Sequence, residues 1–262
     1  MNILLYPNQY TGRQAHQAIQ CRDALEARGH ACTLCINAVK SDDMNGTPLI
    51  SDEYDLVVSL GGDGSVLRAA QTALRLQKPL LGINSGRLGY LCAMDLGEID
   101  RFDELLSACE PTERTVLECI SGKNVRYAFN DVVFAKMRFG ETAELFADID
   151  GTEALHVRGD GLIISSPTGS TAYNLSAGGP VSEPDAPILL LTPICAHAGD
   201  SHPTVLRDSH VIGVRERNGR AQIIIDGETA ETLQTPVIVR KAEHRLKLYR
   251  RRCGGAFQRV TL

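Results

Sequence analysis

Short apolar runs alternate with segments of helical periodicity over the first hundred residues of the chain. The apolar runs are Ile3–Tyr6, Thr33–Ile36, Leu56–Leu60 and Leu80–Ile83. Between them, one helix face is marked by Ala15, Ala18, Cys21 and Leu25, and another by Val66, Ala69, Ala70 and Ala73. The third apolar run is almost continuous, which is typical of a strand covered on both faces. This alternation predicts a parallel sheet in a three-layer α/β domain.

The pattern changes after Pro111, which follows a last helix expected between Ile99 and Leu106. Strand-like runs then dominate, at residues 127–129, 131–134, 162–164, 188–191, 211–214, 223–225 and 237–239. They are separated by the turn pairs Asp150–Gly151, Asn218–Gly219 and Asp226–Gly227. We therefore expect an α/β domain at residues 1–110 and an antiparallel, β-rich domain at 111–262, whose C-terminal tail could return to the first. A ligand site is expected in the cleft between the two.

The overall charge argues against several classes of partner. The chain has 262 residues and a formal net charge of −5, so it has no global positive field to hold nucleic acid. A polyanionic substrate would need glycine-rich backbone, a few basic side chains or a metal ion. The apolar start at Met1–Tyr6 is too short for a signal peptide, and no apolar stretch approaches the roughly 20 residues of a membrane span. These features predict a soluble, cytoplasmic protein.

The cysteines do not suggest a metal centre. There are eight, and the single CxxC, Cys32 to Cys35, lies in an apolar strand-like run with no second pair at zinc-ligand spacing. Buried, reduced thiols in a cytosolic protein are the favoured interpretation.

The first motif with chemical character is Gly61-Gly62-Asp63-Gly64-Ser65, between an apolar strand and a helix. Its glycines let the backbone approach a ligand, Ser65 can cap the helix, and a helix start favours anions, so Gly61, Gly62, Gly64 and Ser65 are candidate phosphate-binding residues. Asp63 would repel phosphate unless it takes a proton or holds a metal ion. Both are tasks of phosphoryl transfer, although a turn in which Asp63 only caps the helix is equally compatible with the local sequence.

A second motif runs from Gly159-Asp160-Gly161 to Pro180 and contains Pro167-Thr168-Gly169-Ser170-Thr171-Ala172-Tyr173-Asn174. Its hydroxyls and amides at a strand-to-helix junction could recognise ribose and adenine edges, and Tyr173 offers an aromatic face. An ordinary loop with a helix cap at Thr168 or Ser170 is the alternative. Asn130-Asp131, between the two motifs, is by itself more typical of a turn. The chain has neither GxxxxGK[ST] nor GxGxxG after its first strand, which argues against a P-loop enzyme and a Rossmann dehydrogenase.

Taken together, these motifs resemble the NAD kinase family. The segments Gly82 to Leu91 and Thr192 to Cys195 are similar to two further family segments, and the order and spacing agree over nearly the whole chain. The GGDG motif is shared with lipid kinases and phosphofructokinases, whereas the block from Pro167 to Pro180 is specific. Ser65, Tyr90 and Asp131 stand where the family usually has Thr, Phe and Glu.

The resemblance implies roles for individual residues. Asp63 would be the general base on the adenosine ribose 2′-hydroxyl of NAD. Asn130 and Asp131 would hold ribose hydroxyls, and Arg158 and Asp160 would lie near the nicotinamide half. Cys195 would approach from a neighbouring subunit. The implied substrate-binding residues are Gly64, Tyr90, Asn130, Asp131, Arg158, Asp160, Thr168, Thr171, Ala172, Tyr173, Asn174, Leu175, Ser176, Cys195 and Glu228.

The resemblance further implies an ATP:NAD phosphotransferase that makes NADP, with polyphosphate as a possible donor and Mg²⁺ or Mn²⁺ as metal. A lipid kinase with the same GGDG core would lack the Pro167–Pro180 block, and a dinucleotide sensor without catalysis could dispense with Asp63. We expect a homo-oligomer, dimer or tetramer, that binds NAD and ATP and neither nucleic acid nor membrane. The long apolar run Ile188–Cys195 is compatible with cover by a partner subunit or with an internal core strand.

Two other groups of residues have simpler explanations. His197 and His202 flank an expected loop, with no carboxylate or cysteine at metal spacing, so a structural role is favoured. The C-terminal cations alternate with Leu246 and Leu248, which predicts a strand with a solvated basic face; contact with donor phosphates is the alternative. This basic cluster consists of Arg245, Lys247, Arg250, Arg251 and Arg252.

Overall fold

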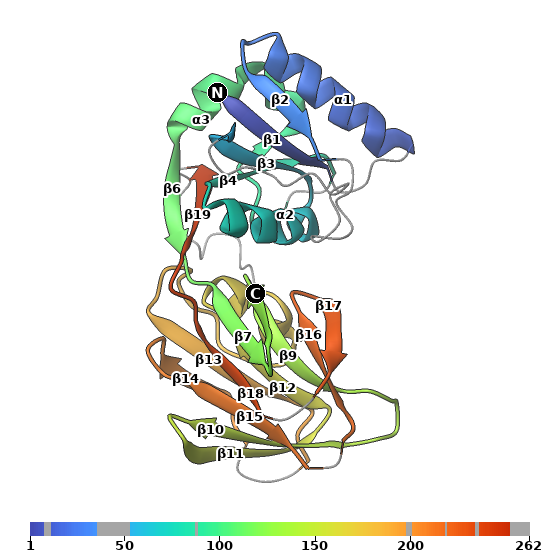
Figure 1. The fold of residues 1–262 in the computed structure, drawn as a ribbon, viewed down its shortest axis with the longest axis vertical. Coiled ribbons are helices and arrows are strands. Elements are labelled where there is room, and N and C mark those ends of the chain that lie inside the picture. Colours follow the sequence, from blue (N-terminus) through green and yellow to red (C-terminus); the bar gives the residue numbers. More distant parts are fainter. Residues whose placement is uncertain are drawn as a thin grey trace. The chain divides into compact units, whose positions relative to one another are not determined.

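The computed structural model describes residues 1–7, 12–35, 53–86, 89–197, 201–217, 219–233 and 236–251. The chain divides into two compact units (Figure 1). Unit 1 is Met1–Glu113 with His244–Leu262, and unit 2 is Arg114–Glu243. Residues 244–251, near the end of the chain, therefore belong to the same unit as its beginning.

Unit 1 is built on one sheet with the strand order β2-β1-β3-β4-β19-β6, and β5 pairs with β4. The strands are β1 Asn2–Pro7, β2 Ala31–Leu34, β3 Leu56–Gly61, β4 Leu80–Asn84, β5 Met94–Asp95, β6 Cys109–Arg114 and β19 Leu246–Arg251. The pairs β1–β2, β1–β3, β3–β4, β4–β5 and β4–β19 are all parallel. The predicted parallel sheet is thus confirmed.

The helices of unit 1 pack on this sheet. They are α1 Gly12–Glu26, α2 Asp63–Leu76, the 3-10 helix η2 Leu96–Arg101, and α3 Phe102–Ala108. Side chains of α1 and α3, including Leu25 and Phe102, form one core cluster with alternate residues of β1 and β3. The buried face of α2 contains Val66, Ala69, Ala70 and Ala73, as its periodicity predicted. Every residue of β3 is buried, which agrees with cover on both faces.

One local feature of unit 1 differs from the sequence interpretation. The second strand is Ala31–Leu34, two residues earlier than predicted, and Ile36 lies outside the described residues. Pro111 lies just beyond α3, as expected, and is part of β6. Because β6 ends the strand order, its missing amide is tolerated there.

Unit 2 contains two six-stranded sheets, ordered β11-β10-β15-β18-β7-β8 and β14-β13-β12-β9-β16-β17. All their pairings are antiparallel. The strands are β7 Leu117–Ser121, β8 Asn124–Ala128, β9 Asp131–Lys136, β10 Ala143–Ile149, β11 Thr152–Gly159, β12 Gly161–Ser165, β13 Ile188–Ile194, β14 Thr204–Arg207, β15 Ile212–Glu216, β16 Ala221–Ile225, β17 Glu228–Thr232 and β18 Val237–Lys241. The short helices η3 Thr168–Thr171 and α4 Tyr173–Ser176 follow β12.

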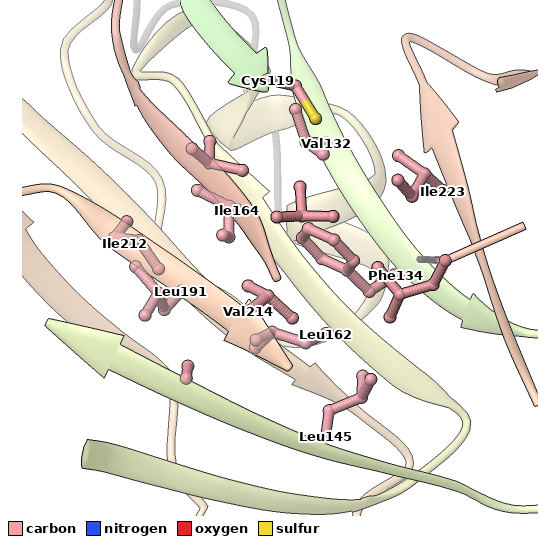
Figure 2. Close-up of a cluster of buried hydrophobic side chains, with 14 of the residues drawn as sticks. Cys119, Val132, Phe134, Leu145, Leu162, Ile164, Leu191, Ile212, Val214 and Ile223 are labelled. Carbon is pink, nitrogen blue, oxygen red and sulfur yellow. The ribbon is translucent and has the colours of Figure 1, made fainter. Parts of the chain in front are cut away.

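A single hydrophobic cluster draws on strands of both sheets of unit 2 (Figure 2). Phe134 and Leu162 come from one sheet, and Leu145 and Val214 from the other. Leu189 and Leu191 of β13 belong to the same cluster. The apolar run that begins at Ile188 is therefore covered by its own unit, as expected of an internal core strand.

Two predicted hairpin turns are confirmed. Asp150 and Gly151 have φ of 51° and 82° between β10 and β11, and Asp226 and Gly227 have φ of 48° and 84° between β16 and β17. Positive φ at both central residues is the requirement of the type I′ turn. The third predicted turn includes Asn218, which lies outside the described residues.

None of the helices in the described part of the chain is long and apolar enough to cross a membrane. None of the seven cysteines in the described ranges forms a disulfide. Four of them, Cys21, Cys35, Cys109 and Cys119, are buried, and Cys195 is exposed.

Candidate functional site

The glycine-rich motif of unit 1 lies where β3 ends and α2 begins. Gly62 is the residue before the helix, and Asp63 is the first residue of its 14-residue run. A Cβ at Gly62 or Gly64 would meet nothing within 4 Å, so both glycines border open space. The start of a helix carries partial positive charge and outward N–H groups. This part of unit 1 is thus suited to an anion such as phosphate.

Ser65 does not cap this helix, contrary to the sequence interpretation. A capping residue must precede the helix, whereas α2 already begins at Asp63 and has no side-chain cap at Gly62. The Ser65 hydroxyl is buried and has no hydrogen-bond partner within the described residues.

Asp63 is held by the segment that follows β4. One carboxylate oxygen, Oδ2, accepts the backbone N–H of Tyr90 at 2.8 Å, and Oδ1 accepts that of Leu91 at 2.9 Å. Gly89 lies so close that a Cβ there would collide with the Asp63 carboxylate. Each carboxylate oxygen has a second lone pair, so Asp63 keeps the capacity to accept a proton from a ligand hydroxyl.

The same segment is tied to β5 through Asn84. The Asn84 side-chain nitrogen donates to Asp95 at 2.7 Å and to the carbonyl of Gly86 at 3.1 Å. The two residues between Gly86 and Gly89, Arg87 and Leu88, lie outside the described residues. The tyrosine side chain at position 90 is 42% exposed and so remains accessible.

In unit 2, Asn130 and Asp131 stand at the start of β9 beside a third polar residue, Asp226. The Asp226 carboxylate accepts three successive backbone N–H groups: Phe129 at 2.7 Å, Asn130 at 2.7 Å and Asp131 at 3.1 Å. Asp226 was predicted only as a turn residue. The signal that could have found it is an Asp-Gly pair directly after the apolar run of β16.

Burial is the main cause of a raised pKa in both carboxyl groups. The pKa of Asp131 rises to about 7, first because the group is buried and second because Asp226 is near. Burial raises the pKa of Asp226 to about 6 although its three backbone N–H donors act to lower it. Glu228, exposed at the start of β17, also raises the pKa of Asp226, so it lies within electrostatic reach.

Asp160 lies between β11 and β12 and forms an ion pair. Its Oδ1 is 2.6 Å from Nζ of Lys136, at the end of β9. The flanking glycines allow close strand contact: a Cβ at Gly159 would come within 2.8 Å of the Ile194 carbonyl oxygen, and one at Gly161 would collide with the carbonyl of Phe134. Arg158 is exposed on β11.

The loop after β12 has one fully buried polar residue, Asn174, and an exposed rim formed by Tyr173, Leu175 and Ser176. Asn174 is fully buried: its side-chain nitrogen donates to the carbonyls of Ser170 and Pro180, both at 3.0 Å, and its oxygen accepts the hydroxyl of Thr192 at 2.7 Å. Both amide hydrogens are therefore used to fold the loop. Thr168, Thr171 and Ala172 are partly buried, and Tyr173, Leu175 and Ser176 are exposed.

Tyr173 lies near three other predicted site residues of unit 2. Its pKa is raised by partial burial and then by the nearby Cys195, Asp160 and Asp131. The structure thus brings Cys195, Asp160 and Asp131 of the same chain into electrostatic reach of Tyr173. Cys195 is exposed and adopts a left-handed backbone with φ of 45°.

The C-terminal cations belong to a strand of unit 1, whereas the structural role expected of His197 and His202 stays a prediction. The backbone N–H of His197 donates to the carbonyl of Arg158 at 2.8 Å. In β19, Leu246 and Leu248 are buried, as predicted for a strand with a basic face. Within unit 1, Arg251 pairs with Glu98 at 2.8 Å and Arg245 with Glu113 at 3.6 Å. Arg252 lies outside the described residues.

Comparison with protein families identifies both halves of the chain. Residues 12–113 match the family model described as the ATP-NAD kinase N-terminal domain. Residues 129–251 match the model described as the ATP-NAD kinase C-terminal domain. The two matches together span most of the sequence, including both motifs and the Asn130–Asp131 pair.

Individual proteins agree with these matches. The NAD kinase of Sulfurimonas denitrificans is 39% identical over 191 residues, which cover 71% of this chain and 67% of the relative. That of Caldicellulosiruptor bescii is 37% identical over 202 residues, covering 75% and 77%. Yeast NADH kinase complexed with NADH has a TM-score of 0.79 at 23% identity, covering 95% of this chain and 83% of that one. An NAD kinase from Archaeoglobus fulgidus in complex with ATP has a TM-score of 0.78 at 24% identity, covering 96% and 94%. At these identities, the two solved structures show the fold.

Proposed function

The chain belongs to the ATP-NAD kinase family, and from this premise we propose that it transfers the terminal phosphoryl group of ATP to the 2′-hydroxyl of the adenosine ribose of NAD. As a member of the family it is a kinase that phosphorylates NAD with ATP. The observation that carries the proposal for the site is the Asp63 carboxylate. It stands at the start of α2, held by two backbone N–H groups, with lone pairs left for a hydroxyl proton.

In this proposal Asp63 is the general base. It accepts the proton of the 2′-hydroxyl as the oxygen attacks the terminal phosphorus of ATP, and the bond from that phosphorus to the bridging oxygen of ADP breaks. A ribose hydroxyl is a weak acid, so the proton moves late, as the new bond forms. The N–H groups at the start of α2 and the open space at Gly62 and Gly64 favour the phosphates of the donor.

The residues of unit 2 would bind and orient NAD. In this assignment Asn130 and Asp131 bind ribose hydroxyls, and Asp160 and Arg158 bind the nicotinamide half of NAD. The exposed rim around Tyr173 binds the adenosine half. Two features support this assignment: the electrostatic proximity of Tyr173 to Asp131 and Asp160, and the polar character of the loop after β12. Orientation of the reacting hydroxyl would supply much of the rate, because correct placement removes the entropy cost of encounter.

A divalent ion, Mg²⁺ or Mn²⁺, fits this chemistry as an ion bound to the phosphates of ATP. No cluster of three His, Cys, Asp or Glu side chains exists among the described residues, so the ion would be held mainly by the phosphates and by water. Mg²⁺ typically binds in this way, with one or two carboxylates, and Asp63 is the acidic residue in the first turn of α2. When bound, such an ion neutralises charge on the donor phosphates.

Two further expectations remain proposals. We place the protein in the cytoplasm, because its described cysteines form no disulfide and four of them are buried thiols. We also propose a homo-oligomer, which rests on the family resemblance; in the structure the exposed Cys195 lies within electrostatic reach of Tyr173 of its own chain.

A purified-protein assay tests the proposed function. NAD and NADH are each combined with ATP and with inorganic polyphosphate, and the product is analysed by phosphorus NMR for the position of the new phosphate. We expect NADP from NAD and ATP, loss of activity in EDTA, and recovery with Mg²⁺ or Mn²⁺. Phosphate on any other hydroxyl would refute the assignment of the acceptor, and full activity in chelator would refute the metal.

A further inference from the structure

Asp226 lies in the hairpin turn between β16 and β17, next to the start of β9 (Figure 1). The last register pair of β16 and β9 is Ile225 with Val132, so the turn extends the ladder by one residue to Asp131. There the backbone N–H of Asp226 donates to the Asp131 carbonyl at 3.1 Å. The side chain then turns back and accepts the N–H groups of residues 129, 130 and 131.

The same short segment is bound on its other side by Ser166, the residue that follows β12. The hydroxyl of Ser166 donates to the Phe129 carbonyl at 2.6 Å, and its backbone N–H donates to the Asn130 carbonyl at 2.8 Å. A Cβ at Gly169 would collide with that Asn130 carbonyl, so the loop after β12 also presses against it. The N–H groups of residues 129–131 are thus bound by Asp226, and the carbonyls of residues 129 and 130 are bound by Ser166.

We propose that Asp226 is a positioning residue for NAD: by binding three successive N–H groups, it fixes the direction in which Asn130 and Asp131 present their side chains to the ribose. This inference rests on the proposed function, in which Asn130 and Asp131 hold ribose hydroxyls. In this role Asp226 acts through the backbone that it binds and not through contact with the substrate, because both of its carboxylate oxygens accept N–H groups of residues 129–131.

A carboxylate suits this position better than an amide for a simple reason. Three donors converge on one side chain, and a carboxylate has acceptors on both oxygens, whereas the NH₂ of asparagine would point donors at one of the N–H groups. Asparagine tolerates the left-handed backbone of the turn as well as aspartate does, so Asp226→Asn keeps the hairpin but replaces one of the two acceptor oxygens and loses at least one of the three N–H bonds.

The chain supplies a matched control in Asp150. It occupies the equivalent place in the other Asp-Gly hairpin of unit 2, with φ of 51°, and its carboxylate binds the N–H of Val211 at 2.9 Å. Asp150→Asn therefore makes the same chemical change in the same kind of turn, without contact to residues 129–131.

The test compares steady-state kinetics and direct NAD binding for Asp226→Asn, Asp150→Asn, Asn130→Ala and the double variant Asp226→Asn/Asn130→Ala. We expect Asp226→Asn to raise the KM and Kd for NAD by about tenfold or more, as for lost hydrogen bonds to a charged group, and to change kcat less. Asp150→Asn should leave both constants unchanged. In the Asn130→Ala background the additional effect of Asp226→Asn should shrink, because the side chain that it directs is gone.

The outcomes separate the inference from the function on which it rests. If Asn130→Ala raises the KM for NAD but Asp226→Asn lowers only thermal stability or active fraction, Asp226 is structural and the inference is wrong. If Asn130→Ala itself leaves NAD binding unchanged, the ribose assignment fails first. Should Asp226→Asn not fold, Ser166→Ala releases the opposite side of the same segment. An unchanged KM and Kd in that folded variant would overturn the inference.

Discussion

The carboxylate of Asp63 accepts the backbone N–H of Tyr90 at 2.8 Å. This bond joins the first residue of α2 to the segment after β4, which is 27 residues further along the chain. Two motifs that are separate in the sequence, GGDG and the segment around Gly89, therefore form one arrangement in unit 1. The orientation of the Asp63 carboxylate, the proposed base, therefore depends on the backbone N–H groups of Tyr90 and Leu91.

Replacing Asp63 tests its role as base. We expect Asp63→Asn to keep the fold and most NAD binding, because asparagine retains one acceptor for the Tyr90 and Leu91 N–H groups. Turnover should fall by about 10²–10⁴-fold, as for the loss of a general base. Kinetics and isothermal calorimetry with NAD measure the two effects. A kcat near that of the wild type would remove Asp63 from this role.

Gly89 should matter for the orientation of Asp63 rather than for the fold. In Gly89→Ala the new Cβ would collide with the carboxylate and force it to move. Misplacement by about 1 Å can cost on the order of 10²-fold in rate. Gly86→Ala is the matched control, since a Cβ there meets nothing within 4 Å. Equal kcat in the two variants would contradict the prediction.

Asp160 is predicted to act on NAD binding. Asp160→Ala should raise the KM for NAD more than it lowers kcat, because a hydrogen bond to a charged group contributes about 1.5–3 kcal/mol. Since Asp160 pairs with Lys136 at 2.6 Å, Lys136→Met serves as a control for the loss of the ion pair alone. An unchanged KM in Asp160→Ala would exclude the residue from the substrate site.

Stability should depend on pH through Asp131. Its folded-state pKa of about 7 is above the ordinary value of 3.8, so the folded protein binds this proton more tightly. The contribution to stability is complete at low pH and is lost as pH rises from 4 to 7. Asp131→Asn should therefore be more stable than wild type at pH 8, by about 2–4 °C in Tm per kcal/mol of relief.

Asp150→Asn is a control, because Asp150 should make stability depend on pH in the opposite direction. The N–H of Val211 and then His210 lower the pKa of Asp150, so its contribution is present at neutral pH and is lost in acid. Thermal unfolding followed by circular dichroism between pH 4 and 8 distinguishes the two variants. Parallel curves for wild type and Asp131→Asn would show that Asp131 does not titrate as described.

The proposed oligomer is tested by dilution. Specific activity should fall in step with dissociation observed by light scattering, because a separated subunit would lack a wall that includes Cys195 of its neighbour. The apolar run at Ile188 gives no support to this expectation, since its own unit covers it. A fully active monomer would refute the shared site and leave the kinase assignment intact.

The sequence predicted most helices and strands of unit 1, because the buried strands of a parallel sheet and the helices that cover it have clear hydrophobic patterns. Strands such as β3 are apolar throughout, and α2 repeats its buried residues at helical spacing. In unit 2 the sequence missed β10 and β11, where Glu144, Asp148 and Glu153 interrupt the apolar character. One face of this hairpin is solvated, so its strands alternate between apolar and polar residues instead of forming apolar runs.

The sequence by itself determined the family, the order of the motifs and the two Asp-Gly hairpins, because these depend on neighbouring residues. Only the tertiary structure decided that Asp63 binds the N–H of Tyr90, and that Asp226 binds three N–H groups nearly a hundred residues earlier in the chain. Such bonds depend on strand order and register, and a shift of one residue would turn these side chains to the other face. Periodicity reports which face of an element is buried, whereas the partner of a polar group is set by what the fold brings next to it.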